Sequence, residues 1–220
     1  MNRVSKMFKR LVQKNANGAN GSKSVNHRCE PLITDLETHM PFGNEEPWAP
    51  NKDEIELLRQ SWLDDNSELF AFQREFGEDI FEYIFDHAPE VKRLFPEAES
   101  YGPNWKQNPR FRRQILRFVQ VIEETLRLME HPDELDQYLY DIGAAHVKYT
   151  PRGFHAGMWK TFKQGIDYAM ALRCQATVDC ADRRQEAQAL WAQLSVSIVQ
   201  KMYVGFAETL VMEFCALNCA

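Results

Sequence analysis

Apolar residues recur at helical spacing along most of this chain, and the stripe that most constrains the fold ends in a histidine. The stripe consists of Leu135, Leu139 and Ile142, and His146 follows four residues later in the same phase. This spacing places the four side chains on one face of a helix, so the imidazole is expected to point into a core. An unpaired buried polar group costs about 1–3 kcal/mol, so the imidazole needs a partner. A backbone carbonyl, a carboxylate or a metal ion would each satisfy it.

A second helical stripe, earlier in the chain, also carries a polar side chain. Its apolar members are Phe111, Ile115, Phe118, Ile122 and Leu126. Gln114 lies between Phe111 and Phe118 at helical spacing, so its amide is expected to face the core as well. Taken singly, each polar residue has an ordinary interpretation, as a core histidine bonded to a carbonyl or as an amide packed between helices. Together they indicate a cavity whose occupant both can touch.

The remaining pattern is typical of an all-α protein. Helix-forming residues dominate, alternating β-branched runs are absent, and 44% hydrophobic residues in 220 are enough for one core. No stretch reaches the ~18 apolar residues that a membrane span requires. We expect a folded domain at residues 51–206, preceded at 1–50 by a basic amphipathic segment and a disordered linker. A long amphipathic helix is expected to open at Trp191, and residues 207–220 form a C-terminal extension that prolongs it.

Several short motifs follow one another in a fixed order between about Asp53 and Phe206. They are Trp62 in the first helix, Gly-x-x-Ile-Phe-x-x-Ile-Phe at 77–85, a six-residue step from Pro89 to Phe95, Leu-x-x-Ile-Gly-x-x-His at 139–146, and Trp-x-x-Leu at 191–194. In this order they resemble the globin family, most closely single-domain globins of nematodes and other invertebrates and the neuroglobins of nerve tissue. The resemblance implies an all-α globin fold with about seven to eight helices around a haem pocket, and one haem b as cofactor.

The resemblance also implies roles for the two polar residues. His146 matches the proximal histidine, whose Nε2 would bind the haem iron. Its Nδ1–H would donate to the carbonyl of Ile142, one turn earlier, and so fix the tautomer. Gln114 matches the distal position, where it would contact iron only through the bound ligand. Since an amide ligates iron poorly, an open distal site is expected rather than coordination by two histidines.

Further residues match positions that line the pocket. Phe95 matches the corner phenylalanine that packs on the porphyrin, and Phe81 and Phe118 match two other wall positions. Arg117 lies one turn beyond Gln114, where it would either reach a haem propionate or remain a solvated surface residue.

The function that the resemblance implies is reversible binding of dioxygen, for transport or storage. Alternatives are a haem-based redox protein or gas sensor, and an enzyme such as a nitric-oxide dioxygenase or nitrite reductase. The enzymatic alternatives are less favoured, because they need a redox partner and this chain shows no flavin or nicotinamide segment. A helical interaction module without haem is the remaining alternative.

Charge is distributed unevenly. Residues 1–30 hold seven Lys or Arg and a single acid, Glu30, although the whole chain has a net charge of −6. The acidic remainder argues against nucleic acid as a partner. Within residues 3–14, basic and apolar residues alternate at helical spacing. This segment is interpreted as an unpartnered tail, a peripheral contact with an anionic membrane, or a mitochondrial transit peptide.

The cysteines indicate the kind of cellular compartment in which the protein is expected. Their number, five, is odd and no secretory signal precedes them, which favours a reducing compartment and a cytoplasmic protein, with membrane association as an alternative. Cys174 and Cys180 are close enough in sequence to form a redox-responsive disulfide, but two unpaired thiols are the favoured interpretation.

Overall fold

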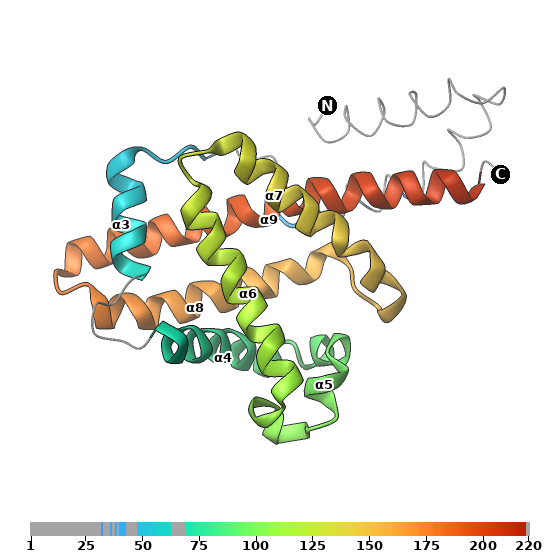
Figure 1. Cartoon of the computed structure of the whole chain (residues 1–220), viewed down its shortest axis with the longest axis horizontal. Coiled ribbons are helices and arrows are strands. Elements are labelled where there is room, and N and C mark those ends of the chain that lie inside the picture. Colours follow the sequence, from blue (N-terminus) through green and yellow to red (C-terminus); the bar gives the residue numbers. More distant parts are fainter. Residues whose placement is uncertain are drawn as a thin grey trace. The chain divides into compact units, whose positions relative to one another are not determined.

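A computed structural model describes residues 32, 36, 38, 40–42, 48–62 and 69–218 (Figure 1). These residues contain helices and turns but no strand, which confirms the all-α prediction. The basic segment at 3–14 lies outside the described residues. Within the described part, no helix is both long and apolar enough to cross a membrane.

The chain divides into two compact units. The Gln114 unit comprises residues 47–135 and 158–198, and the His146 unit comprises residues 1–46, 136–157 and 199–220. Helices lying wholly in the Gln114 unit are α3 (Lys52–Trp62), α4 (Leu69–His87), α5 (Pro96–Glu99), α6 (Pro109–Leu128) and α8 (Trp159–Thr177), with the 3-10 turns η1 (Pro89–Leu94) and η2 (Gly102–Gln107). The His146 unit holds η3 (Val147–Arg152) and most of α7 (Pro132–Ala145), while η4 (Ala156–Met158) and α9 (Ala181–Asn218) contribute to both units.

The first helix of the Gln114 unit begins at a capping box. The side-chain oxygen of Asn51 accepts hydrogen bonds from the backbone amides of Asp53 and Glu54, at 2.9 and 3.0 Å. In return, the Glu54 carboxylate accepts from the Asn51 amide at 2.7 Å. This reciprocal pair satisfies amides that have no partner inside the helix, so it fixes where α3 starts.

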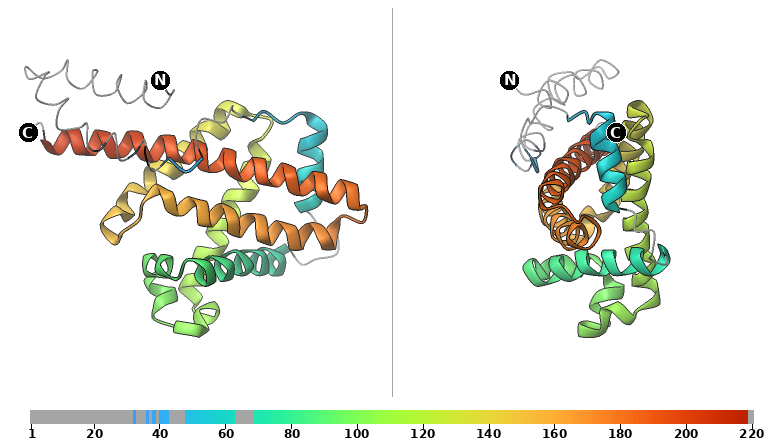
Figure 2. Two further views of the ribbon diagram at one scale, coloured as in Figure 1. Left: turned by 180° about the vertical axis from the view of Figure 1, so that it is seen from behind. Right: turned by 90° about the vertical axis from the view of Figure 1, so that its left-hand side faces the viewer.

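Aromatic packing holds α3 to its neighbours. The ring of Trp62 lies 4.9 Å from Phe76 of α4 and 5.6 Å from Trp191 of α9, measured between centroids. The indole N–H of Trp191 donates to Ser61 Oγ at 2.8 Å, so this buried polar group is paired. Helix α4 in turn packs against α6 and α8, and it crosses α6 rather than running alongside it (Figure 2).

The N-terminus of α6 is fixed by a buried asparagine. Asn108 Oδ1 accepts from the amides of Arg110 and Phe111, and Asn108 Nδ2 donates to the Glu97 carbonyl at 2.8 Å. Pro109 occupies the first helical turn, where its missing N–H needs no partner. The segment that ends in Asn108 is therefore bound both to α6 and to α5.

Asn108→Ala is expected to lower the free energy of unfolding by about 1–2 kcal/mol, the usual upper range for loss of a helix cap. The loss is expected near the top of that range because the Glu97 carbonyl also loses its donor. Urea denaturation of the full chain measures it, with Asn104→Ala as control, since Asn104 is exposed in the adjacent η2. Equal stability of the two variants would contradict the capping role.

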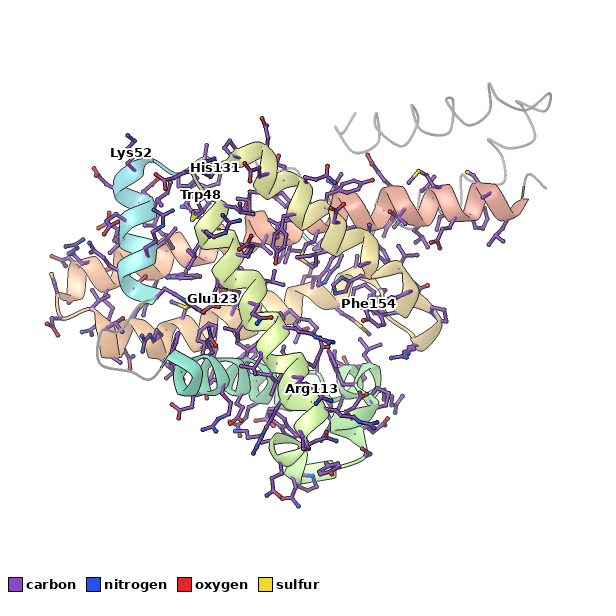
Figure 3. All side chains as sticks on the ribbon, in the orientation of Figure 1. Trp48, Lys52, Arg113, Glu123, His131 and Phe154 are labelled. Carbon is purple, nitrogen blue, oxygen red and sulfur yellow. The ribbon has the colours of Figure 1, made fainter. Side chains whose placement is uncertain are left out.

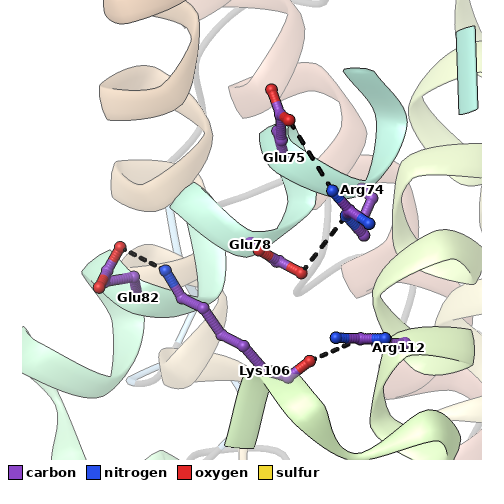
Figure 4. Close-up of polar contacts among 6 residues, drawn as sticks. All are labelled: Arg74, Glu75, Glu78, Glu82, Lys106 and Arg112. Atoms are coloured by element: carbon purple, nitrogen blue, oxygen red, sulfur yellow. Dashed lines mark hydrogen bonds and ion pairs between the residues drawn. The ribbon is translucent and has the colours of Figure 1, made fainter. Parts of the chain in front are cut away.

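Polar contacts cover the surface near the same corner (Figure 4). Lys106 Nζ lies 2.8 Å from the Glu82 carboxylate of α4, and Arg112 Nε donates to the Lys106 carbonyl at 2.6 Å. On α4 itself, Arg74 lies 3.8 Å from Glu78. Each such exposed ion pair contributes only about 0–1 kcal/mol to the free energy of unfolding. These contacts therefore orient η2 against α4 and α6 more than they stabilise the fold.

In the His146 unit, α7 and α9 approach each other at two glycines. A Cβ atom added to Gly143 would lie 1.8 Å from the Met202 carbonyl oxygen, and one added to Gly205 would lie 2.0 Å from the Tyr140 carbonyl oxygen. Beside this contact, Tyr140 OH donates to the Glu208 carboxylate at 2.8 Å. The two helices thus pack backbone to backbone, which only glycine permits.

The last helix is longer at its start than the sequence pattern predicted. It begins at Ala181 rather than Trp191, because residues 181–190 are good helix formers without Gly or Pro and bury Ala187 and Leu190. At its other end, α9 continues to Asn218, which confirms that the C-terminal extension prolongs it.

Part of the segment expected to be a linker packs on the fold. Leu36 is 4% exposed and Pro41 is buried. The Leu36 carbonyl accepts a hydrogen bond from Tyr203 OH, and the Phe42 carbonyl accepts from Gln200 Nε2 at 3.3 Å. Composition alone did not predict this packing, since the segment has few apolar residues and the sequence does not show that they pack on α9.

Cys174 is buried in α8, whereas Cys180 is exposed just before α9, and no disulfide joins them. The favoured interpretation of two separate thiols agrees with this arrangement.

Candidate functional site

His146 follows the last residue of α7 and retains helical backbone angles. Its Nδ1 lies 2.7 Å from the Ile142 carbonyl oxygen, so the predicted hydrogen bond is present. Because a carbonyl oxygen can only accept, Nδ1 carries the proton and Nε2 carries the lone pair. That tautomer is the one in which Nε2 can bind a metal.

The surroundings of His146 favour its neutral form. Burial lowers the pKa of His146, the hydrogen bond to Ile142 opposes this change, and the nearby charge of Lys148 lowers the pKa further. A histidine must be neutral to ligate a metal. The imidazole is therefore prepared for ligation at neutral pH.

Aromatic rings surround the imidazole within the His146 unit. The Tyr149 ring lies 5.8 Å and the Phe154 ring 5.3 Å from the His146 ring, and Phe154 lies 5.6 Å from Phe206 of α9. Figure 3 labels Phe154 in the segment that follows α7. Phe154 was not predicted as a site residue, since it lies outside the helical stripe that ends in His146.

The stripe on α7 is buried only over its first part. Leu135 and Leu139 are buried, as predicted, whereas Ile142 and His146 are half-buried. The prediction that the whole face is buried was therefore wrong for its last turn. A half-buried histidine beside a half-buried isoleucine leaves surface that a large apolar ligand could cover.

Three predicted wall residues come together in the Gln114 unit. The Phe81 ring lies 5.3 Å from Phe95 and 5.7 Å from Phe118. Phe162 of α8 joins them at 6.0, 6.4 and 5.9 Å from Phe81, Phe95 and Phe118, respectively. Phe162 was not predicted from the sequence, although it continues a helical stripe through Trp159 and Ile166. Phe81 is buried, while the other three rings of this aromatic cluster are half-buried.

Gln114 and Arg117 both lie on α6, one turn apart. Gln114 is half-buried and Arg117 is exposed. Helical spacing places Gln114 between Phe111 and Phe118, beside the aromatic cluster. The exposure of Arg117 agrees with both of its predicted roles, a propionate contact or a solvated surface residue.

The chemistry of these residues fits a haem. A porphyrin presents broad apolar faces and one metal ion that needs an axial ligand. His146 offers a neutral imidazole whose tautomer is fixed by Ile142, and the aromatic cluster offers half-buried rings.

Comparison with known proteins identifies the family. A family model described as globin matches residues 78–202, more than half of the chain. The chain belongs to the globin family. The matched residues of this globin include Gln114 and His146, and membership supports haem as the cofactor.

Two similar proteins extend the comparison. The globin-related protein glb-13 of Caenorhabditis elegans is 28% identical over 153 residues, which cover 69% of this chain and 51% of the relative. This globin thus spans about half the length of that relative. A crystal structure of a hexacoordinated haem protein from an anhydrobiotic tardigrade, at pH 4, matches with a TM-score of 0.58 and 18% identity. That match covers 74% of this chain and 99% of the other, and it shows a shared fold.

Proposed function

We propose that this globin binds one haem b through His146 and binds dioxygen reversibly, for transport or storage. The observation that carries the proposal is the 2.7 Å contact between His146 Nδ1 and the Ile142 carbonyl. It leaves the imidazole in the tautomer that a proximal ligand needs, and the family resemblance assigns that ligand to this residue. When bound, the haem supplies the ferrous centre at which a diatomic gas binds.

The remaining site residues act on the gas and on the haem edge. The Gln114 amide donates an N–H to the gas ligand and so slows its escape. The aromatic cluster of Phe81, Phe95, Phe118 and Phe162 covers the porphyrin and excludes water. Arg117 neutralises a propionate. Each role rests on the family resemblance together with the exposure and contacts described above.

Absorption spectra of the full chain test the proposal. We expect a Soret band in the oxidised, dithionite-reduced and carbon-monoxide-bound states, and a reduced spectrum of the five-coordinate, high-spin type. No Soret band after addition of haem would overturn haem binding. A low-spin, six-coordinate reduced spectrum would overturn the open distal site while leaving haem binding intact. Hexacoordination is known in the tardigrade haem protein that shares this fold, so the spectrum decides between two real alternatives.

Gln114→Leu is expected to raise the dissociation rate of dioxygen about 10-fold, because one hydrogen bond to a charge-bearing ligand is worth about 1.5–3 kcal/mol. Stopped-flow displacement of dioxygen by carbon monoxide measures the rate. Gln120→Leu is the matched control, since Gln120 lies on the exposed side of the same helix. Equal dissociation rates in the two variants would show that Gln114 is not the donor.

A haem-based sensor is the second candidate function. It is favoured by the hydrogen bonds that join Leu36 and Phe42 to α9, because a plain carrier has no need of such an attachment.

A further inference from the structure

A short stretch of α9 binds the chain's own N-terminal region. Tyr203 OH and Gln200 Nε2 donate to the backbone carbonyls of Leu36 and Phe42. Tyr203 is 1% exposed and Leu36 is 4% exposed, so the first of these hydrogen bonds lies in a dry environment. Leu36 and residues 40–42, which together are here called the strap, are therefore held by specific polar contacts and by burial of an apolar anchor.

The same stretch of α9 touches the helix that leads to His146. Gly143 of α7 packs directly on the backbone of Met202, which is the residue before Tyr203. Gly205, two residues beyond Tyr203, packs on the backbone of Tyr140. Because no side chain lies between the two backbones, neither helix can shift without moving the other.

A continuous set of contacts thus joins the strap to the imidazole within the His146 unit. Gly143 is bonded to Ile142, whose carbonyl accepts the hydrogen bond from His146 Nδ1. A second route runs from the His146 ring through Phe154 to Phe206 of α9. A change in the position of His146 therefore reaches the α9 surface that holds the strap by two paths.

We propose that the surface of α9 at Gln200 and Tyr203 is a docking site for the strap, and that strap docking is coupled, through His146, to binding of the gas ligand that Gln114 contacts. This coupling rests on the proposed function. If gas binding shifts His146 and the end of α7, the contact of Gly143 with the Met202 backbone would carry that shift to α9 and so change how tightly the strap is held. By linkage, complete release of the strap changes gas affinity by the same factor by which gas binding changes strap docking.

Hydrogen exchange of the full holoprotein provides the first test. Exchange at residues 36–42 is measured by mass spectrometry in the reduced protein with and without carbon monoxide. We expect the two rates to differ by about 5-fold or more, the lower end of typical couplings. Equal exchange in both states would overturn the proposal.

Tyr203→Phe provides the reciprocal test, because it removes only the hydroxyl that reaches Leu36. We expect faster exchange at the strap and a change in carbon monoxide affinity of at most the factor by which carbon monoxide changes that exchange. Tyr168→Phe is the control, since Tyr168 is exposed on α8. If Tyr203→Phe does not fold, Gln200→Ala takes its place, with Gln193→Ala, exposed on the same helix, as its control.

The outcomes separate the two proposals. A normal Soret band with loosened strap and unchanged carbon monoxide affinity would overturn the coupling and leave haem binding standing. Absence of a Soret band in the unsubstituted protein would overturn haem binding and the coupling together.

Discussion

His146→Ala is expected to abolish the Soret band of this globin. The substitution removes the imidazole proposed as axial ligand, and loss of a mere hydrogen-bond partner of a ligand already costs about 10- to 100-fold in metal affinity. The expected loss of haem affinity is larger than that range. Titration of the apoprotein with haem, followed by absorption, measures it, and added imidazole is expected to restore part of the band by occupying the space that the side chain leaves.

His131→Ala is the control for this experiment. His131 is exposed just before α7, and its contact with Glu134, at 4.0 Å, is a surface pair of little energetic weight. Its variant is expected to bind haem like the unsubstituted protein. An unchanged Soret band in His146→Ala would assign the axial ligand to another residue and remove the basis of the proposed function.

Local spacing explains why the sequence predicted α7 and its histidine bond. Leu139, Ile142 and His146 share a helical face, and a four-residue step brings Nδ1 of His146 to the carbonyl of Ile142. Relations of this kind need no knowledge of the rest of the fold. Pro89 likewise begins η1, where its missing N–H needs no partner.

Periodicity could not separate residues that enter the core from residues that border a site. Ile142 and Phe118 have the same spacing as their buried neighbours, yet both are half-buried. Phe154 and Phe162 reach the site residues through the folded path of the chain, so no local pattern distinguishes them from ordinary core aromatics. The haem roles of these residues remain predictions.

Contacts between segments that are distant in the chain could not be predicted from the sequence, for a different reason. The strap has the composition of a linker, and only the positions of Gln200 and Tyr203 on the folded α9 reveal what its carbonyls meet. Likewise, Gly143 and Gly205 are ordinary helical glycines until the opposing backbones are known.

Gly143→Ala is expected to lower the free energy of unfolding by about 3 kcal/mol or more, the upper range for overpacking. In an isolated helix the same change is favourable by about 1 kcal/mol, so the sign of the effect is diagnostic. The added Cβ would lie 1.8 Å from the oxygen and 2.5 Å from the carbonyl carbon of Met202, and backbone atoms cannot rotate away. Urea denaturation of the holoprotein measures the change.

Gly205→Ala is also expected to lower the free energy of unfolding, because its Cβ would meet the Tyr140 backbone at 2.0 Å. Gly157→Ala is the control, since its Cβ would meet only the His155 side chain, at 3.0 Å, which can turn aside.

If Gly143→Ala folds by moving α7 away from α9, the displacement begins three residues before His146. A folded Gly143→Ala variant should therefore show altered carbon monoxide affinity as well as a lower free energy of unfolding. A Gly143→Ala variant more stable than the unsubstituted protein would contradict the backbone contact on which the coupling of the strap to His146 depends.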